Sequence, residues 1–102
     1  MKTVWKYAVP VGQDVRIEMD AAAKILHVEA FSPDIVLFWA EVHPAPTRLI
    51  RRHFEVFGTG HDIPLGAQHL GTTSLGGGEL VWHLYELTSN HKPFPDPDGV
   101  PV

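Results

Sequence analysis

The chain has 102 residues, a formal net charge of −4 and no cysteine, with 44% hydrophobic and 20% charged residues. This composition is typical of a globular domain and argues against intrinsic disorder, while the missing cysteines exclude a disulfide framework and a thiolate zinc site. Eight lysine and arginine residues are too few for a large nonspecific nucleic-acid surface, and no apolar run is long enough to cross a bilayer. We therefore expect a cytoplasmic protein that binds neither membranes nor nucleic acid.

Apolar and polar residues alternate with a period of two along the first part of the chain, which predicts β-strands. The pattern is clearest where Val15, Ile17 and Met19 alternate with charged residues. The segment from Asp20 to Lys24 is expected to form a tight connection, because the β-branched and aromatic run after it leaves little room for a helix. The first strands are expected over residues 3–9, 15–20 and 24–31.

The next expected strand, 35–40, differs because it is apolar at both odd and even positions. Such a strand is typical of a sheet covered on both faces or of an interface between subunits. The three glycines 76–78, between two β-rich runs, predict a hairpin. The remaining strands are expected over residues 48–57, 68–75 and 79–87.

These features predict an all-β fold of six to seven short strands, arranged as a small antiparallel sandwich or barrel. Residues 1–88 are expected to form a single β domain, because two halves of such a chain would each be too small to bury a core. The segment 89–102 contains four prolines and is expected to form a disordered or extended tail.

Four segments carry a resemblance to a known group of proteins. They are Trp5-Lys6-Tyr7, residues 23–28, Gly58-Thr59-Gly60-His61 and residues 80–86. Together they resemble a family of small uncharacterised proteins found mainly in bacteriophage and prophage genomes. The resemblance implies a cytoplasmic accessory protein of an infected bacterium that binds a host component, and it carries no activity to transfer.

A basic cluster stands out from this acidic chain and predicts a site for an anion. Arg48, Arg51, Arg52 and His53 form the cluster, because arginine holds phosphate or carboxylate through a bidentate fork. The alternative is a solvated outer strand face, paired with neighbouring glutamates such as Glu18 or Glu55.

The Gly58–His61 segment is a second candidate for anion binding. Thr59, Gly60 and His61 could present backbone amides and a hydroxyl to the same ligand. The segment lacks the lysine and the following helix of a phosphate-binding loop. The plainer interpretation is a strand-exit turn that needs a positive φ and that His61 caps.

Histidines are frequent, and three of them suggest a metal site. His61, His69 and His83 would converge if the loop and the final hairpin lie side by side, with Asp62 as a further ligand. No spacing places two of these ligands together locally, so scattered histidines are the plainer interpretation and no cofactor is expected.

Self-association is expected from the strands that are apolar on both faces. The interface residues predicted from this pattern are Val36, Phe38, Trp39, Trp82 and Tyr85. A two-layer core that covers the same side chains is the alternative.

Three functional hypotheses follow. The first is a non-enzymatic, homo-oligomeric binding protein that acts on a host component as an inhibitor or adaptor. The second is a protein that sequesters an anionic small molecule, such as a nucleotide immune signal, as a counter-defence. The third is a metal-dependent hydrolase. The absence of cysteine and of a serine in a nucleophile elbow favours the non-enzymatic hypotheses, and no catalytic residue is predicted.

Overall fold

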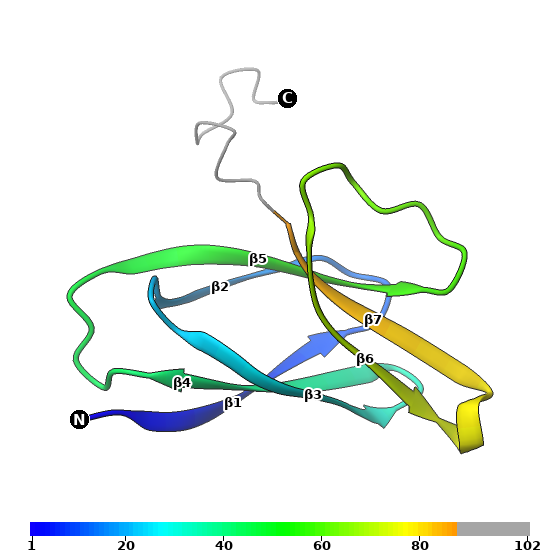
Figure 1. Ribbon diagram of the computed structural model, residues 1–102, viewed down its shortest axis with the longest axis horizontal. Coiled ribbons are helices and arrows are strands. Elements are labelled where there is room, and N and C mark those ends of the chain that lie inside the picture. The colour runs from blue at the N-terminus through cyan, green and yellow to red at the C-terminus, as the bar shows by residue number, and fades with distance from the viewer. Residues whose placement is uncertain (88–102) are drawn as a thin grey trace.

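The computed structural model describes residues 1–87, and the predicted tail, 89–102, lies outside the described residues. Seven strands and one turn of 3₁₀ helix follow one another along the chain (Figure 1). The elements are β1 (Thr3–Pro10), β2 (Val15–Asp20), β3 (Lys24–Ser32), β4 (Ile35–Val42), β5 (Leu49–Gly58), β6 (Gln68–Leu75), η1 (Gly76–Gly78) and β7 (Leu80–Leu87). Within residues 1–87 no helix is long and apolar enough to span a membrane.

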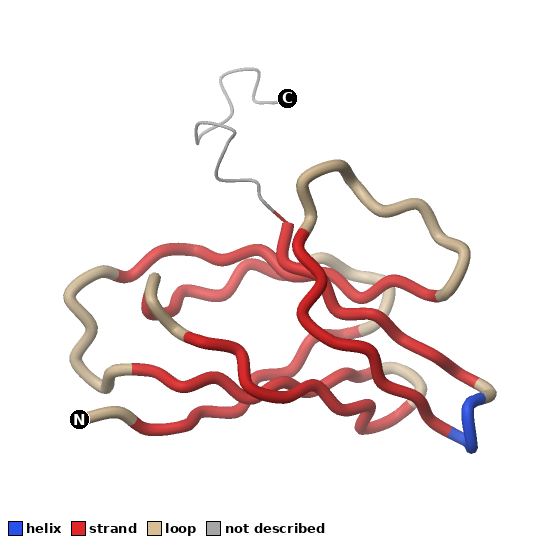
Figure 2. Tube along the Cα trace, viewed as in Figure 1, coloured by secondary structure: helices blue, strands red, loops and turns tan. Residues whose placement is uncertain are grey.

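The strands form two antiparallel sheets, which confirms the predicted all-β class and, of the two predicted arrangements, the sandwich (Figure 2). One sheet has three strands in the order β1-β4-β3, and the other has four in the order β2-β5-β7-β6. The loop between β5 and β6 extends clear of both sheets (Figure 1). The predicted strand boundaries agree with the observed ones to within about two residues, as is usual for elements with a strong period.

The tight connection predicted after β2 is also present. The backbone N–H of Ala23 donates to the carbonyl oxygen of Asp20 at 3.0 Å, which closes the turn between β2 and β3. The carboxylate of Asp20 accepts a further bond from the N–H of Ala22 at 2.9 Å. The aspartate therefore organises the turn with both its backbone and its side chain, as aspartates commonly do in turns.

The core lies between the two sheets and consists of the strand positions that alternate inward. On β4 these include Val36, Phe38 and Ala40, which have no exposed surface. The ring of Phe38 stacks on Tyr7 of β1 at a centroid distance of 5.0 Å and contacts Phe54 of β5 at 4.8 Å. Phe38 thus joins the two sheets, and burial of one such side chain stabilises a fold by about 1.5–3 kcal/mol.

The sandwich is closed along one side, where β3 of one sheet meets β6 of the other. The backbone N–H of Ala30 donates to the Thr73 hydroxyl at 2.9 Å. A Cβ atom at Gly71 would lie only 2.6 Å from a methyl carbon of Val28, so glycine permits the close approach of the two strands. On the other side, among the described strands, β1 pairs only with β4 and β2 pairs only with β5. The seam between β1 and β2 is therefore open.

One detail of β3 differs from the predicted alternation. Strict alternation along residues 24–31 predicts Leu26 on the same face as Val28 and Ala30, but Leu26 is exposed, while Ile25 packs against the core. The register with β4 shifts between Ile25 and His27, where β3 has a bulge. A bulge inserts one residue into the alternation, so every position before it moves to the other face of the sheet.

Candidate functional site

The basic residues predicted to bind an anion lie along β5 and just before it, where alternation divides them between two faces. Arg48 and Arg51 are exposed, and Arg51 lies opposite Glu18 in the register of β2 with β5. Arg52 follows Arg51 directly and points to the other side, into the sandwich. The three guanidinium groups therefore do not converge on one point.

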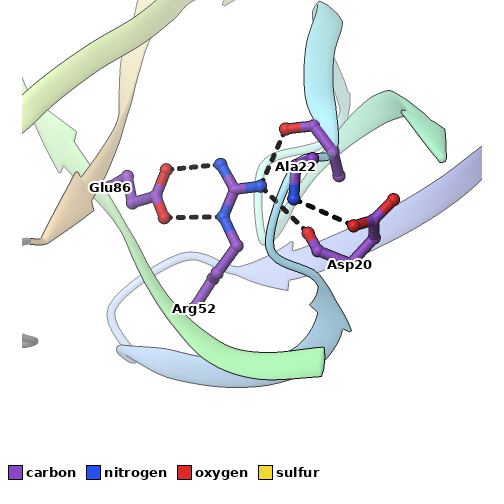
Figure 3. Close-up of polar contacts among 5 residues, drawn as sticks. Asp20, Ala22, Arg52 and Glu86 are labelled. Atoms are coloured by element: carbon purple, nitrogen blue, oxygen red, sulfur yellow. Dashed lines mark hydrogen bonds and ion pairs between the residues drawn. The ribbon is translucent and has the colours of Figure 1, made fainter. Parts of the chain in front are cut away.

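Arg52 is bound inside the fold (Figure 3). Its Nε and Nη2 atoms each lie 2.7 Å from a carboxylate oxygen of Glu86, which makes a bidentate ion pair between β5 and β7. Its Nη1 atom donates to the carbonyl oxygen of Ala23 at 2.8 Å. Only 11% of the Arg52 side chain is exposed. Arg52 therefore links three segments of the chain, and its donors are not available to a ligand.

His53 faces outward from the four-stranded sheet but is nearly buried. Its Nε2 atom lies 2.6 Å from Oδ2 of Asp14, in the connection between β1 and β2. Its Nδ1 atom is buried and has no hydrogen-bond partner among the described residues. The bond from His53 lowers the pKa of the Asp14 carboxyl. Neither ring nitrogen of His53 is therefore open to a ligand.

Glu55 lies two residues further along the same face. Burial raises the pKa of the Glu55 carboxyl, and the nearby charge of Asp14 adds to the effect. On β7, Tyr85 is the residue opposite Glu55. This part of the outer face thus carries a partly desolvated carboxylate beside an existing carboxylate–histidine pair, which disfavours an anionic ligand there.

The Gly58–His61 segment is a closed turn. The N–H of His61 donates to the carbonyl oxygen of Gly58, and the N–H of Gly58 donates to Nδ1 of His61, both at 3.2 Å. Gly60 has φ +92°, a conformation that favours glycine. The two amides are therefore used within the turn, and the structure has the strand-exit turn that His61 caps. Along β5, Thr59 is eight residues from Arg51, roughly 26 Å in an extended strand.

Two of the three histidines predicted to bind metal do come together. The rings of His69 and His83 lie side by side on the outer face of β6 and β7, with centroids 6.4 Å apart. His61 instead contacts its own turn. Between residues 1 and 87, no group of three or more histidine, aspartate or glutamate side chains is arranged to hold a metal ion.

Threonine hydroxyl groups contact three of the four ring nitrogens of this histidine pair. His83 contacts Thr59 through Nε2 and Thr72 through Nδ1, each at 2.9 Å, and Thr72 also lies 2.8 Å from Nε2 of His69. This chain of hydrogen bonds connects the start of the β5–β6 loop to β6 and β7. The histidines therefore have a structural explanation, since they anchor the loop to the sheet.

The five residues predicted to form an interface lie in three different places. Val36 and Phe38 are core residues with no exposed surface, so the prediction that they contact a partner is corrected. Trp82 packs against the core, and its Nε1 atom is buried. Tyr85 lies on the outer face of the four-stranded sheet, where its ring contacts Phe57 and His69. Of the five, Trp39 alone lies on the outer face of the three-stranded sheet.

That outer face is apolar, and we name it the apolar face. Its centre is the stripe of Ile35, Leu37 and Trp39, the outward residues of β4, all partly exposed. Further exposed apolar side chains lie on the two neighbouring strands. They are Val4 on β1 and Leu26 and Phe31 on β3. The outer face of the four-stranded sheet is instead mixed, with Arg51, His53 and Glu55 on the same face as Phe57 and Tyr85.

The open seam between β1 and β2 contains a groove of about 270 Å³. Trp5, Met19, Pro44 and Leu49 provide apolar walls, and Glu18 and Asp20 are its acidic groups. The Asp20 carboxylate accepts bonds from the backbone N–H groups of Ala22 at 2.9 Å and His43 at 3.1 Å, and these bonds lower its pKa. A negative charge thus lies at a largely apolar groove.

The sequence did not indicate this groove as a site. Its walls come from the start of β1, the end of β2, the β4–β5 connection and the start of β5, which are distant along the chain. The signals that could have indicated it are Trp5 at the beginning of a strand and the proline pair Pro44 and Pro46 at a bend.

Comparison with known proteins places the chain in one family. A model described as a domain of unknown function, DUF7352, matches residues 1–94, which include all of the described sandwich and extend into the predicted tail. No curated protein and no solved structure matches the chain. On the extent of the family match, this chain belongs to the DUF7352 family.

Proposed function

We propose that this protein is a non-enzymatic binding domain that self-associates through its apolar face. The observation that supports the proposal is the partly exposed stripe of Ile35, Leu37 and Trp39, beside Val4, half of whose surface is exposed, and Phe31, with 68% exposed. Contiguous apolar surface of this kind on a small domain commonly marks an interaction site.

The placement of charge on the apolar face favours a second copy of the chain as the occupant. Lys6 lies on β1 opposite Trp39, and Glu29 lies on β3 opposite Leu37, so the two charges flank the central strand. A two-fold axis along β4 would stack the β1 strand of one copy over β3 of the other. Lys6 of each copy would then approach Glu29 of the other, in the self-complementary manner of a two-fold interface.

The polar groups of the described residues support binding over catalysis. The carboxylate of Glu86 is held by Arg52, and that of Asp14 by His53. Arg52 in particular is unavailable to the anionic ligand of the second hypothesis. The phage setting, a host target and a cytoplasmic location stay predictions from the sequence.

Sedimentation of the full chain across a range of concentrations tests this proposal. We expect a dimer that Leu37→Glu converts to a monomer, because a charge at the centre of the face cannot be desolvated without a partner. Ser74→Glu on the exposed outer side of β6 is the matched control and should leave the dimer unchanged. Circular dichroism would verify that both variants fold.

A charge exchange tests the two-fold arrangement itself. Lys6→Glu should weaken the dimer, and the double variant Lys6→Glu with Glu29→Lys should restore it. A wild-type chain that is monomeric at every concentration would contradict self-association. A dimer that survives Leu37→Glu would show that another surface forms the contact.

A further inference from the structure

We infer that the groove between β1 and β2 binds a lysine or arginine side chain presented by an extended peptide segment of a partner protein. This site is separate from the apolar face, which lies on the outer side of the three-stranded sheet. The inference therefore does not depend on self-association.

The shape and walls of the groove suit a long side chain with an apolar stem. Its volume of about 270 Å³ is set among Trp5, Met19, Leu49 and the prolines of the β4–β5 connection. Trp5 is 49% exposed and Leu49 is 54% exposed, so both present apolar surface at the opening. The methylene groups of lysine or arginine bury well against such walls while the charged head contacts polar groups.

The charges at the groove select a cation. Its acidic groups are Glu18 and Asp20, His43 is the one other titratable side chain among its lining residues, and no lysine or arginine lines it. Asp20 is 7% exposed, and its carboxylate accepts the two backbone N–H groups described above. It forms no ion pair within residues 1–87, although the charges of His43 and Arg52 lie near it. A carboxylate has room for further donors, and the face of an exposed tryptophan attracts a cation. Trp5 and the two acids thus offer complementary contacts to one basic group.

The strand edges beside the groove explain why the segment should be extended. In the described part of the chain, neither β1 nor β2 has a second strand beside it. Three residues of β2, Glu18, Met19 and Asp20, line the groove. A peptide that adds to the β2 edge would satisfy its own backbone groups and place alternate side chains toward the groove, which is a common mode of peptide recognition.

The test is a titration of the ¹⁵N-labelled full chain with the blocked peptide Ac-Thr-Val-Arg-Val-Thr-NH₂, followed by NMR. The control peptide has citrulline in place of arginine, which keeps the shape and removes the charge. We expect saturable shift changes at the amides of Trp5, Glu18 and Leu49 with the arginine peptide. The citrulline peptide should bind at least about fivefold more weakly, because hydrogen bonds to charged groups are the stronger ones.

Substitutions in the groove should reduce the affinity without unfolding the domain. Glu18→Gln, at an exposed position, and Trp5→Leu should each weaken binding of the arginine peptide about three- to fivefold. Glu79→Gln, at the exposed β6–β7 hairpin, is the control and should leave the affinity unchanged. The amide spectrum of each variant reports whether it is folded.

Four results would overturn the inference. Equal affinity for the arginine and citrulline peptides would exclude recognition of a cation. Shift changes at Leu37 and Trp39 in place of the groove would assign the peptide to the apolar face. Shift changes at the groove that follow protein concentration without any peptide would assign the groove to a second copy of the chain. Groove shifts of the free protein that change to those of an empty groove in Lys92→Ala would assign it to a lysine of the chain itself.

Discussion

The guanidinium group of Arg52 faces the carboxylate of Glu86 in two parallel hydrogen bonds of 2.7 Å, between strands that lie 34 residues apart in the sequence. Both side chains are largely buried, so each charge depends on the other. The ion pair also fixes the β2–β3 turn, because Arg52 donates to the carbonyl oxygen of Ala23.

We predict that Arg52→Ala lowers the free energy of unfolding by about 3 kcal/mol, since it leaves the Glu86 carboxylate buried without a counter-ion. Arg52→Met with Glu86→Leu should recover most of this loss, because removing both charges removes the desolvation cost. Urea denaturation measures both values. A loss of less than about 1 kcal/mol for Arg52→Ala would mean that solvent screens the pair.

The close contact of Gly71 with Val28 leads to a second prediction. Gly71→Ala should destabilise the protein by about 1–3 kcal/mol, because the new methyl group would overlap the Val28 side chain and separate β3 from β6. Val28→Ala in the same chain should reduce that penalty, so a double-mutant cycle should give a favourable coupling. Additive effects of the two substitutions would contradict direct contact.

The acid sensitivity of the fold should depend on Asp20. Hydrogen bonds from the N–H groups of Ala22 and His43 lower the folded-state pKa of this carboxyl below its ordinary value of 3.8. The stabilisation is complete above pH 3.8 and is lost as the pH falls through the lower folded-state value. The Asp20→Asn variant should be less stable than the wild type at neutral pH. Its stability should also fall less steeply than that of the wild type as the pH is lowered into the acid range.

Asp34→Asn, in the exposed turn between β3 and β4, is the matched control for Asp20→Asn. Thermal melts from pH 7 to pH 2 would compare the two variants with the wild type. If the melting temperatures of Asp20→Asn and the wild type fall in parallel below pH 3.8, the hydrogen bonds to the Asp20 carboxylate do not stabilise the folded state as predicted.

Glu55 should have the opposite effect on stability. Burial, with the charge of Asp14 as a smaller cause, raises the folded-state pKa of this carboxyl above 4.5, its ordinary value. The ionised form is therefore unfavourable in the folded protein, so stability is lost as the pH rises from 4.5 through the folded-state value. Glu55→Gln should stabilise the protein at pH 7, and the gain should disappear below pH 4.5.

Denaturation at pH 7 and pH 4 measures the Glu55→Gln effect, with Glu79→Gln at the exposed β6–β7 hairpin as control. A gain that is equal at both pH values would point to packing of the amide as its cause. A loss of stability at pH 7 would show that the ionised carboxylate has a favourable partner.

The sequence by itself determined the strands, the tight turn after Asp20, the glycine hairpin and the all-β class, because each depends on neighbours within a few residues. Alternation of period two identifies a strand wherever it occurs, as in Val15, Ile17 and Met19. The sequence pattern also identified strand β4 as apolar on both of its faces. It could not decide between burial and an interface, which depends on what packs against each side.

Only the tertiary structure decided which side chains meet. Arg52 and Arg51 are adjacent in the sequence, so the pleat of the strand directs them to opposite faces. The pairing and packing of the sheets decided that Arg52 is bound inside the sandwich and that Arg51 is exposed. A single bulge reversed the predicted face of Leu26. The groove assembles Trp5 and Leu49 from two sheets. Contacts between residues so distant in the sequence depend on sheet pairing, for which local periodicity carries no signal.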